Sequence, residues 1–205
     1  MRAAAMAERA VSLPDIRDVD VRGRTVLVRA DLNVPMHNGA ITDPGRVKRF
    51  APTVAELVSR GASVVVIGHL GRPDGVANPT LSLKPVAEAL AEALGQRVIF
   101  VPDCVGAVAE QVTRTLPAGA VAVLENLRYH QEEEAGDRSF ALLLSVHGDF
   151  YVNDMPGLAL RSRTARQASI HALSTLMPAF AGPLLVAAQS AVPSPQHPDD
   201  TLEET

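Results

Sequence analysis

The chain has 205 residues, 47% of them hydrophobic, and a formal net charge of −4 at pH 7. This length suits one large domain, and the small negative charge argues against nucleic acid or an anionic membrane as a partner. The single cysteine excludes an internal disulfide framework and favours a reducing compartment, and no apolar run is long enough to cross a membrane, so we expect a cytoplasmic protein.

The first predicted element is a buried strand that begins at Thr25. Residues 26–28 are consecutive apolar residues without helical spacing. Asp31 and Asn33 follow where this strand should end, and Pro35 stops further sheet pairing. Because ligands bind beyond the carboxyl ends of the strands in parallel α/β sheets, Asp31 and Asn33 are candidate ligand-binding residues.

Helix-like and strand-like segments alternate along the rest of the chain. Helices are predicted over residues 44–61, 82–94, 106–116 and 137–146, and strands over residues 63–67, 98–101, 121–124 and 150–152. This alternation predicts an α/β domain with a mostly parallel sheet and helices on both faces. Residues 165–176 and 182–191 also have helical patterns, and the proline-rich, acidic segment 192–205 is predicted to be a disordered tail.

Polar residues follow four of the predicted strands. His69 and Arg72 follow the second strand, and Arg128 follows the fourth. Because the carboxyl ends of parallel strands lie on one edge, we expect these residues to converge with Asp31 and Asn33. Arginines and a histidine on one rim predict an anion site, since bidentate contacts between guanidinium and phosphate are strong and directional.

Each of these residues also has a purely structural explanation. A loop arginine is commonly solvated, and an aspartate at a strand end commonly caps the next turn, so structure and function are equally open for Asp31. The acidic run 132–134 is predicted to be a helix start or a solvated face, and Cys104 a small core residue. Because the same pattern follows four strands, the set indicates a site more strongly than any single member.

Several functional motifs are absent from the sequence. It has no Gly-x-x-x-x-Gly-Lys-Ser/Thr phosphate loop and no Gly-x-Gly-x-x-Gly after a strand. It also lacks His/Cys spacing typical of zinc sites and a Gly-x-Ser-x-Gly elbow. The residues alone therefore predict an α/β domain with an arginine-lined anion site and without a recognisable nucleotide or metal site.

Five stretches, in the same order, resemble motifs in the N-terminal domain of the phosphoglycerate kinase family. Residues 29–35 read Arg-Ala-Asp-Leu-Asn-Val-Pro, which is similar to the family's Arg-Val-Asp-Phe-Asn-Val-Pro. Residues 68–73 read Gly-His-Leu-Gly-Arg-Pro, close to the family's Ser-His-Leu-Gly-Arg-Pro, and the other stretches are 103–106, 124–130 and 151–154. The resemblance runs from about residue 13 to about residue 182. It implies a three-layer Rossmann-like domain.

The resemblance also implies a site for 3-phosphoglycerate. In the family's roles, Asp31 and Asn33 hold the hydroxyl and carboxylate end of the substrate, and Arg46 is the catalytic residue beside the transferring phosphoryl group. In the same family roles, His69, Arg72, Arg128 and Arg161 bind the 3-phosphate. The implied reaction, a step of glycolysis, moves a phosphoryl group between the C1 carboxylate of 3-phosphoglycerate and Mg-ADP/ATP.

The sequence departs from the family in two places. The family's second domain, which binds the nucleotide, has no counterpart. We therefore expect a domain at residues 1–182, with a remnant of the junction helix and the tail at 183–205. Leu160 and Arg163 replace two histidines of the family, and Pro156 should reshape the same loop.

Three interpretations of the chain stay open. It is a half-length kinase-like enzyme, a non-catalytic module that binds phosphoglycerate or a similar anion, or one half of a split kinase. In the split kinase, a separate nucleotide-binding domain or chain completes the site, and the apolar segment 183–191 is a docking helix. That segment fits core packing equally well.

Overall fold

A computed structural model describes residues 13–158 and 167–191. Six strands form one sheet in the order β5-β6-β4-β1-β7-β8, and every neighbouring pair is parallel. The strands are β1 (Thr25–Arg29), β4 (Ser63–Ile67), β5 (Val98–Val101), β6 (Val121–Leu124), β7 (Phe150–Asn153) and β8 (Ala179–Ala181). The predicted parallel sheet is confirmed.

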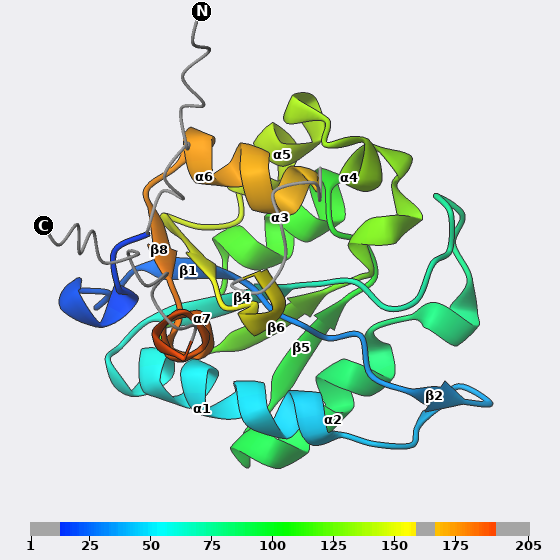
Figure 1. Ribbon diagram of the computed structural model, residues 1–205, viewed down its shortest axis with the longest axis horizontal. Coiled ribbons are helices and arrows are strands. Elements are labelled where there is room, and N and C mark those ends of the chain that lie inside the picture. The colour runs from blue at the N-terminus through cyan, green and yellow to red at the C-terminus, as the bar shows by residue number, and fades with distance from the viewer. Residues whose placement is uncertain (1–12, 159–166, 192–205) are drawn as a thin grey trace, which may run out of the picture.

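Helices cover both faces of this sheet (Figure 1). One face carries α1 (Gly45–Ser59), α2 (Lys84–Leu94) and α7 (Pro183–Ser190). The other carries α3 (Gly106–Arg114), α5 (Arg138–Ser145) and α6 (Leu173–Leu176), with the short α4 (Gln131–Ala135) next to α5. Short turns of 3-10 helix are η1 (Ile16–Asp18), η2 (Pro79–Leu81), η3 (Leu127–Tyr129) and η4 (Pro156–Leu158), and η5 (Ala168–Ala172) is a π-helix. The three-layer α/β architecture is confirmed.

Strand β1 contributes to both hydrophobic cores. Because successive strand residues point to opposite faces, Val26 and Val28 pack in the cluster that contains Phe50 of α1. Leu27 packs in the cluster that contains Phe140 of α5. A strand covered on both faces needs apolar residues at consecutive positions, and this requirement explains the pattern from which the strand was predicted.

The structure adds elements that the sequence did not indicate. Strand β8 was not predicted, and neither was the hairpin formed by β2 (Met36–His37) and β3 (Ala40–Ile41). In its described part, the helix expected over residues 165–176 is η5 followed by α6. The ends of the other helices differ from the prediction by at most two residues. The predicted tail, 192–205, lies outside the described residues. Within the part of the chain that the structure describes, no helix is long and apolar enough to cross a membrane.

Helix α7 is tied to the sheet by Asp154, a fully buried residue directly after β7. Its Oδ1 accepts a hydrogen bond from the backbone N–H of Leu184 at 2.7 Å, and its Oδ2 accepts one from the Thr53 hydroxyl of α1 at 2.7 Å. Burial raises the pKa of Asp154 to about 6. A Cβ atom at Gly182 would lie 2.4 Å from Asp154 Oδ1, so glycine is required for this contact. The domain boundary at residue 182 stays a prediction.

Candidate anion-binding site

A buried arginine at the carboxyl edge of the sheet makes hydrogen bonds to several segments of the chain. Arg29, the last residue of β1, is 0% exposed. Its Nε donates a hydrogen bond to Ser169 Oγ at 2.9 Å, and its Nη1 donates to the carbonyl oxygen of Ala30 at 2.9 Å. Its Nη2 donates to Gln167 Oε1 at 3.3 Å and lies 3.8 Å from Glu133 Oε1. Burial lowers the pKa of Arg29, and the Glu133 carboxylate opposes this shift. The guanidinium nevertheless stays charged.

Glu133 completes this buried network. Its Oε1 accepts a hydrogen bond from the Ser169 hydroxyl at 2.5 Å, and its Oε2 accepts one from the Ser169 backbone N–H at 2.9 Å. The Tyr151 hydroxyl donates to the Ser169 carbonyl oxygen at 2.7 Å. The acidic run 132–134 does start a helix, but only its first and last side chains are exposed. The prediction of a solvated face is therefore wrong for Glu133, which is 0% exposed.

His69 is held by the same arginine. Its Nδ1 lies 2.9 Å from Nη2 of Arg29, and the residue is 8% exposed. Because a guanidinium can only donate, Nδ1 of His69 is the acceptor. A neutral His69 ring then carries its proton on Nε2. Arg29 therefore fixes both the orientation and the tautomer of this histidine.

An open hollow of about 630 Å³ lies beside the loop that follows β1. It is lined by Asn33, Val34, Pro35, Asp43, Arg46 and Arg49. Arg46, in the first turn of α1, forms an ion pair with Asp31, and their side chains are 41% and 27% exposed. The Arg49 side chain is exposed, and its guanidinium makes no hydrogen bond or ion pair to another described residue. Two guanidinium groups on one wall make this hollow suitable for an anion.

Three loops meet at Gly71, which follows β4 in the chain. Its backbone N–H donates to Asn33 Oδ1 at 2.9 Å, and its carbonyl oxygen accepts from Nη1 of Arg128 at 2.8 Å. Arg128 also pairs with Glu134, with 3.1 Å between Nη2 and Oε1. Its Nε is buried and has no hydrogen-bond partner within the described ranges. Arg128 therefore retains one unsatisfied donor.

The fully buried amide of Asn126 fixes the backbone of these loops. Its Oδ1 accepts from the N–H groups of Leu70 at 3.3 Å and Arg128 at 3.1 Å. Its Nδ2 donates to the carbonyl oxygens of Leu70 at 2.7 Å and Leu81 at 2.9 Å. The loop that carries His69 and the loop that carries Arg128 are thus held together as one unit.

Two glycines of this region are required by packing. Gly71 and Gly75 have φ angles of 64° and 78°, which favour glycine. A Cβ atom at Gly71 would lie 2.7 Å from a methyl group of Leu81, and one at Gly75 would lie 2.0 Å from Cγ of Gln131. Loop glycines can let the backbone approach a ligand closely. The close approach that the structure contains is to neighbouring side chains.

The predicted site residues fall into three groups. Contacts around the hollow and Gly71 connect Asp31, Asn33, Arg46 and Arg128. His69 and Arg72 form the second group, outside these contacts. His69 is held by its hydrogen bond with Arg29, and Arg72 is exposed without a hydrogen bond or ion pair to the rest of the described chain. Arg161 lies outside the described residues, as do Leu160 and Arg163.

Sequence reasoning missed two arginines at this edge. Arg49 lies three residues after Arg46, a spacing that places both on one side of a helix and that could have identified it. Arg29 was part of a quoted motif, but no local signal shows that its partners come from residues 167–169, about 140 positions later. Its role could be found only from the fold.

The described residues form no dedicated oxygen-ligand cluster for the Mg-ADP/ATP that the resemblance implies. Magnesium prefers several oxygen ligands, commonly carboxylates. Among residues 13–158 and 167–191, one group of three or more ligand-bearing side chains occurs, and it combines a carboxylate with a thiol and an imidazole. The sequence also lacks the phosphate loops named above. We therefore assign no nucleotide contact to this chain.

Comparison with known proteins shows one consistent likeness. A family model described as "Phosphoglycerate kinase" matches residues 16–198. The chain is 44% identical over 192 residues to the phosphoglycerate kinase of Granulibacter bethesdensis, covering 92% of this chain and 48% of the relative. It is 46% identical over 183 residues to that of Rhizorhabdus wittichii, covering 87% of this chain and 45% of the relative.

A solved structure agrees with these sequence matches. The crystal structure of phosphoglycerate kinase from Pyrococcus horikoshii OT3 matches the chain with a TM-score of 0.78 and 32% identity. The match covers 87% of this chain and 44% of that structure's chain. The chain spans about half the length of the curated relatives it matches.

Proposed function

The chain belongs to the phosphoglycerate kinase family and corresponds to its N-terminal domain, and we propose that it carries the half of the kinase site that binds 3-phosphoglycerate. The observation that carries the proposal is the gathering of Asp31, Asn33, Arg46 and Arg128 around one hollow and one loop at the carboxyl edge of the sheet. In parallel α/β sheets this edge is where ligands bind.

The 3-phosphate is assigned to the residues that follow β4 and β6. The exposed guanidinium of Arg72 can form bidentate contacts with a phosphate. Arg128, 12% exposed, has an unsatisfied Nε and one exposed acidic partner with which a phosphate would compete. His69 contributes the N–H of its Nε2, because Arg29 holds its Nδ1 as an acceptor. Arg161, which the resemblance adds to this group, remains part of the proposal.

The other end of the substrate is assigned to the hollow. Asn33 uses its Oδ1 for Gly71, which leaves its amide N–H groups to donate to a carboxylate. Asp31 accepts a hydrogen bond from the substrate's hydroxyl. To Arg46, which is paired with Asp31, we assign the stabilisation of a phosphoryl group that leaves or reaches the C1 carboxylate.

Nucleotide and magnesium belong to the family reaction, in which they supply or accept the phosphoryl group. Since the described residues form no dedicated site for them, we propose that a second domain or a separate chain binds them. This chain alone then binds 3-phosphoglycerate and transfers little or no phosphate. A cytoplasmic location, expected from the single cysteine, is part of the same proposal.

Isothermal titration calorimetry with 3-phosphoglycerate and with Mg-ATP, each added separately, tests this function. We expect binding of 3-phosphoglycerate only, with affinity reduced about tenfold or more in Arg128→Ala, since a hydrogen bond to a charged group contributes roughly 1.5–3 kcal/mol. Arg97→Ala is the matched control, because Arg97 is exposed and precedes β5 at the opposite edge of the sheet.

Two outcomes of this experiment would contradict the proposal. Absence of 3-phosphoglycerate binding to the folded chain would remove the substrate site. Tight binding of Mg-ATP, or rapid turnover by the purified chain in a coupled kinase assay, would show that the chain itself holds the nucleotide.

A further inference from the structure

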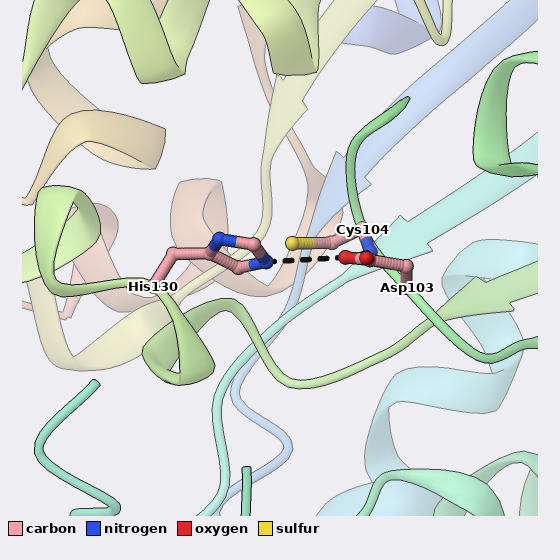
Figure 2. Close-up of side chains that lie close together, drawn as sticks. All are labelled: Asp103, Cys104 and His130. Carbon is pink, nitrogen blue, oxygen red and sulfur yellow. Dashed lines mark hydrogen bonds and ion pairs between the residues drawn. The ribbon is translucent and has the colours of Figure 1, made fainter. Parts of the chain in front are cut away.

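Three side chains outside the anion site bring a carboxylate, a thiol and an imidazole together (Figure 2). They belong to Asp103, Cys104 and His130, and their ligand atoms all lie within 4.8 Å of one another. Asp103 and Cys104 follow β5, whereas His130 joins η3 to α4. We propose that these three residues form a binding site for a zinc-like divalent cation.

The donor set selects the kind of metal. Thiolate and imidazole are preferred ligands of Zn²⁺, which also accepts a carboxylate oxygen, whereas Mg²⁺ and Ca²⁺ prefer oxygen ligands only. Three protein ligands leave the fourth position of a tetrahedral ion to water. The proposed site is therefore open, and unlike a four-ligand structural site it can exchange its fourth ligand.

The spacing of the three side chains suits such an ion. Zinc lies about 2.0–2.3 Å from each ligand, so ligand atoms around it are roughly 3.3–3.8 Å apart. Nε2 of His130 and Oδ1 of Asp103 are already 3.1 Å apart. Figure 2 shows the sulfur of Cys104 directed toward the imidazole ring of His130, with the Asp103 carboxylate alongside. The ligand atoms, all within 4.8 Å of one another, are thus close to the separation that the ion requires.

The surroundings hold two of the ligands in place. Asp103 Oδ1 accepts a hydrogen bond from the backbone N–H of Cys104 at 2.7 Å, which orients the carboxylate. The His130 ring packs against the ring of Phe140, with 5.2 Å between centroids. The Asp103 side chain is 50% exposed and the His130 side chain 29%, so a cation can enter from the Asp103 side.

Charge also favours a cation at this position. Cys104 is fully buried, and burial, with the nearby Asp103 carboxylate as the second cause, raises the pKa of its thiol. The charge of the Asp103 carboxylate attracts a divalent cation, and a cation bound to the sulfur stabilises the thiolate, so binding releases the thiol proton to solvent against the effect of burial. The cation also replaces the hydrogen bond that Nε2 of His130 donates to Asp103 Oδ1. A neutral imidazole that binds the metal through Nε2 then carries its proton on Nδ1.

Cobalt(II) titration of the purified 205-residue chain tests this site. Cys104 is the single cysteine, so a thiolate-to-cobalt charge-transfer absorption can arise only from this residue. We expect this absorption to saturate at one cobalt per chain and to be displaced by Zn²⁺. We expect no such absorption in Cys104→Ser, and about tenfold or greater weakening of cobalt binding in His130→Ala, which keeps the thiol.

The matched control is His171→Ala, because His171 is an exposed histidine in η5 that is not part of this cluster. It should bind cobalt like the unchanged chain, and circular dichroism should show that all variants are folded. As a second measurement, Zn²⁺ should raise the melting temperature of the unchanged chain and of His171→Ala, but not of His130→Ala, since a ligand that binds only the native state stabilises it.

Two results would overturn the site. The first is the absence of a thiolate-to-cobalt absorption in the folded chain, in which case His130 and Asp103 form an ion pair only. The second is an absorption that His130→Ala leaves unchanged, since the metal would then be bound without the imidazole.

Discussion

At the carboxyl edge of the sheet, a buried charged residue, Arg29, and a partly exposed one, Asp31, are two positions apart in the sequence. Arg29 is 0% exposed and makes hydrogen bonds to several elements through its guanidinium. Asp31 is partly exposed, and among the described residues its carboxylate has one ion-pair partner, Arg46. Both belong to the same strand-end motif, yet they differ in solvent exposure and in the number of partners.

This difference distinguishes residues that stabilise the fold from residues that are available to bind a ligand. A buried charge is tolerated only when it is paired and hydrogen-bonded, so the partners of Arg29 and Glu133 are committed to the fold. An exposed charge with few partners keeps its hydrogen-bonding capacity for a ligand. Substitutions in the buried group should therefore reduce stability, whereas substitutions in the exposed group should change ligand affinity and leave stability almost unchanged.

The largest effect is expected for Arg29→Ala. Removing one member of a buried ion pair leaves Glu133 without its charge partner, which costs roughly 3–5 kcal/mol in the free energy of unfolding. Urea denaturation followed by circular dichroism measures this loss. The exposed control Arg97→Ala should change stability by less than about 0.5 kcal/mol. A loss below about 1 kcal/mol for Arg29→Ala would show that the buried network does not support the edge.

The second effect concerns the pH dependence of stability at Asp154. Its pKa of about 6 exceeds the ordinary value of 3.8, so between these two pH values the folded state binds more protons than the unfolded state. Stability from this group therefore rises as the pH falls, by about 2 kcal/mol between pH 7 and about pH 4.5.

Urea denaturation of the unchanged chain and of Asp154→Asn at both pH values isolates this contribution. The amide keeps the size of the side chain but does not titrate. The stability of the unchanged chain relative to Asp154→Asn should rise at the lower pH. A relative stability that is constant or falls would show that Asp154 is not stabilised in its protonated form.

A smaller effect is expected for Asp31→Asn. Its ion pair with Arg46 is partly exposed, so the free energy of unfolding should change by less than about 1 kcal/mol. The affinity for 3-phosphoglycerate should fall about tenfold, because a hydrogen bond to a charged acceptor is weakened. Denaturation and calorimetry on the same preparation check both values. A large loss of stability without a change in affinity would show that Asp31 stabilises the fold and does not bind the substrate.

The smallest effect is expected for Glu134→Gln. Glu134 pairs with Arg128 and would compete with a bound phosphate, so removing its charge should raise the affinity for 3-phosphoglycerate about threefold. Glu132→Gln, a neighbouring exposed glutamate, is the matched control. Weaker binding by Glu134→Gln, with Glu132→Gln unchanged, would mean that Glu134 orients Arg128 rather than competing with the ligand.

Much of the fold could be predicted because the relevant signals are local. The consecutive β-branched residues of β4 indicate a strand covered on both faces, and the helices show apolar residues at helical spacing. Strand β8 was missed because Ala-Phe-Ala is short and lacks β-branched residues. The two-residue strands β2 and β3 are also too short for a periodic signal.

The site was predictable only in outline. Strand ends placed its residues on one edge, and the family resemblance supplied their roles, which stay predictions. Neighbouring acids such as Glu132 and Glu133 look alike in sequence, and only tertiary packing decides which one is buried. The cluster of Asp103 and His130 was invisible for the same reason, since these residues are 27 positions apart and meet only in the folded chain.

The most direct test of the proposed substrate site is calorimetric titration of 3-phosphoglycerate into three proteins: the unchanged chain, Arg72→Ala and Arg97→Ala. Arg72 is exposed without a hydrogen bond or ion pair to the described residues, so its loss should not affect folding. We predict an affinity at least about tenfold lower in Arg72→Ala and unchanged in Arg97→Ala. Equal affinities in all three proteins would contradict a phosphate site at the carboxyl edge of the sheet.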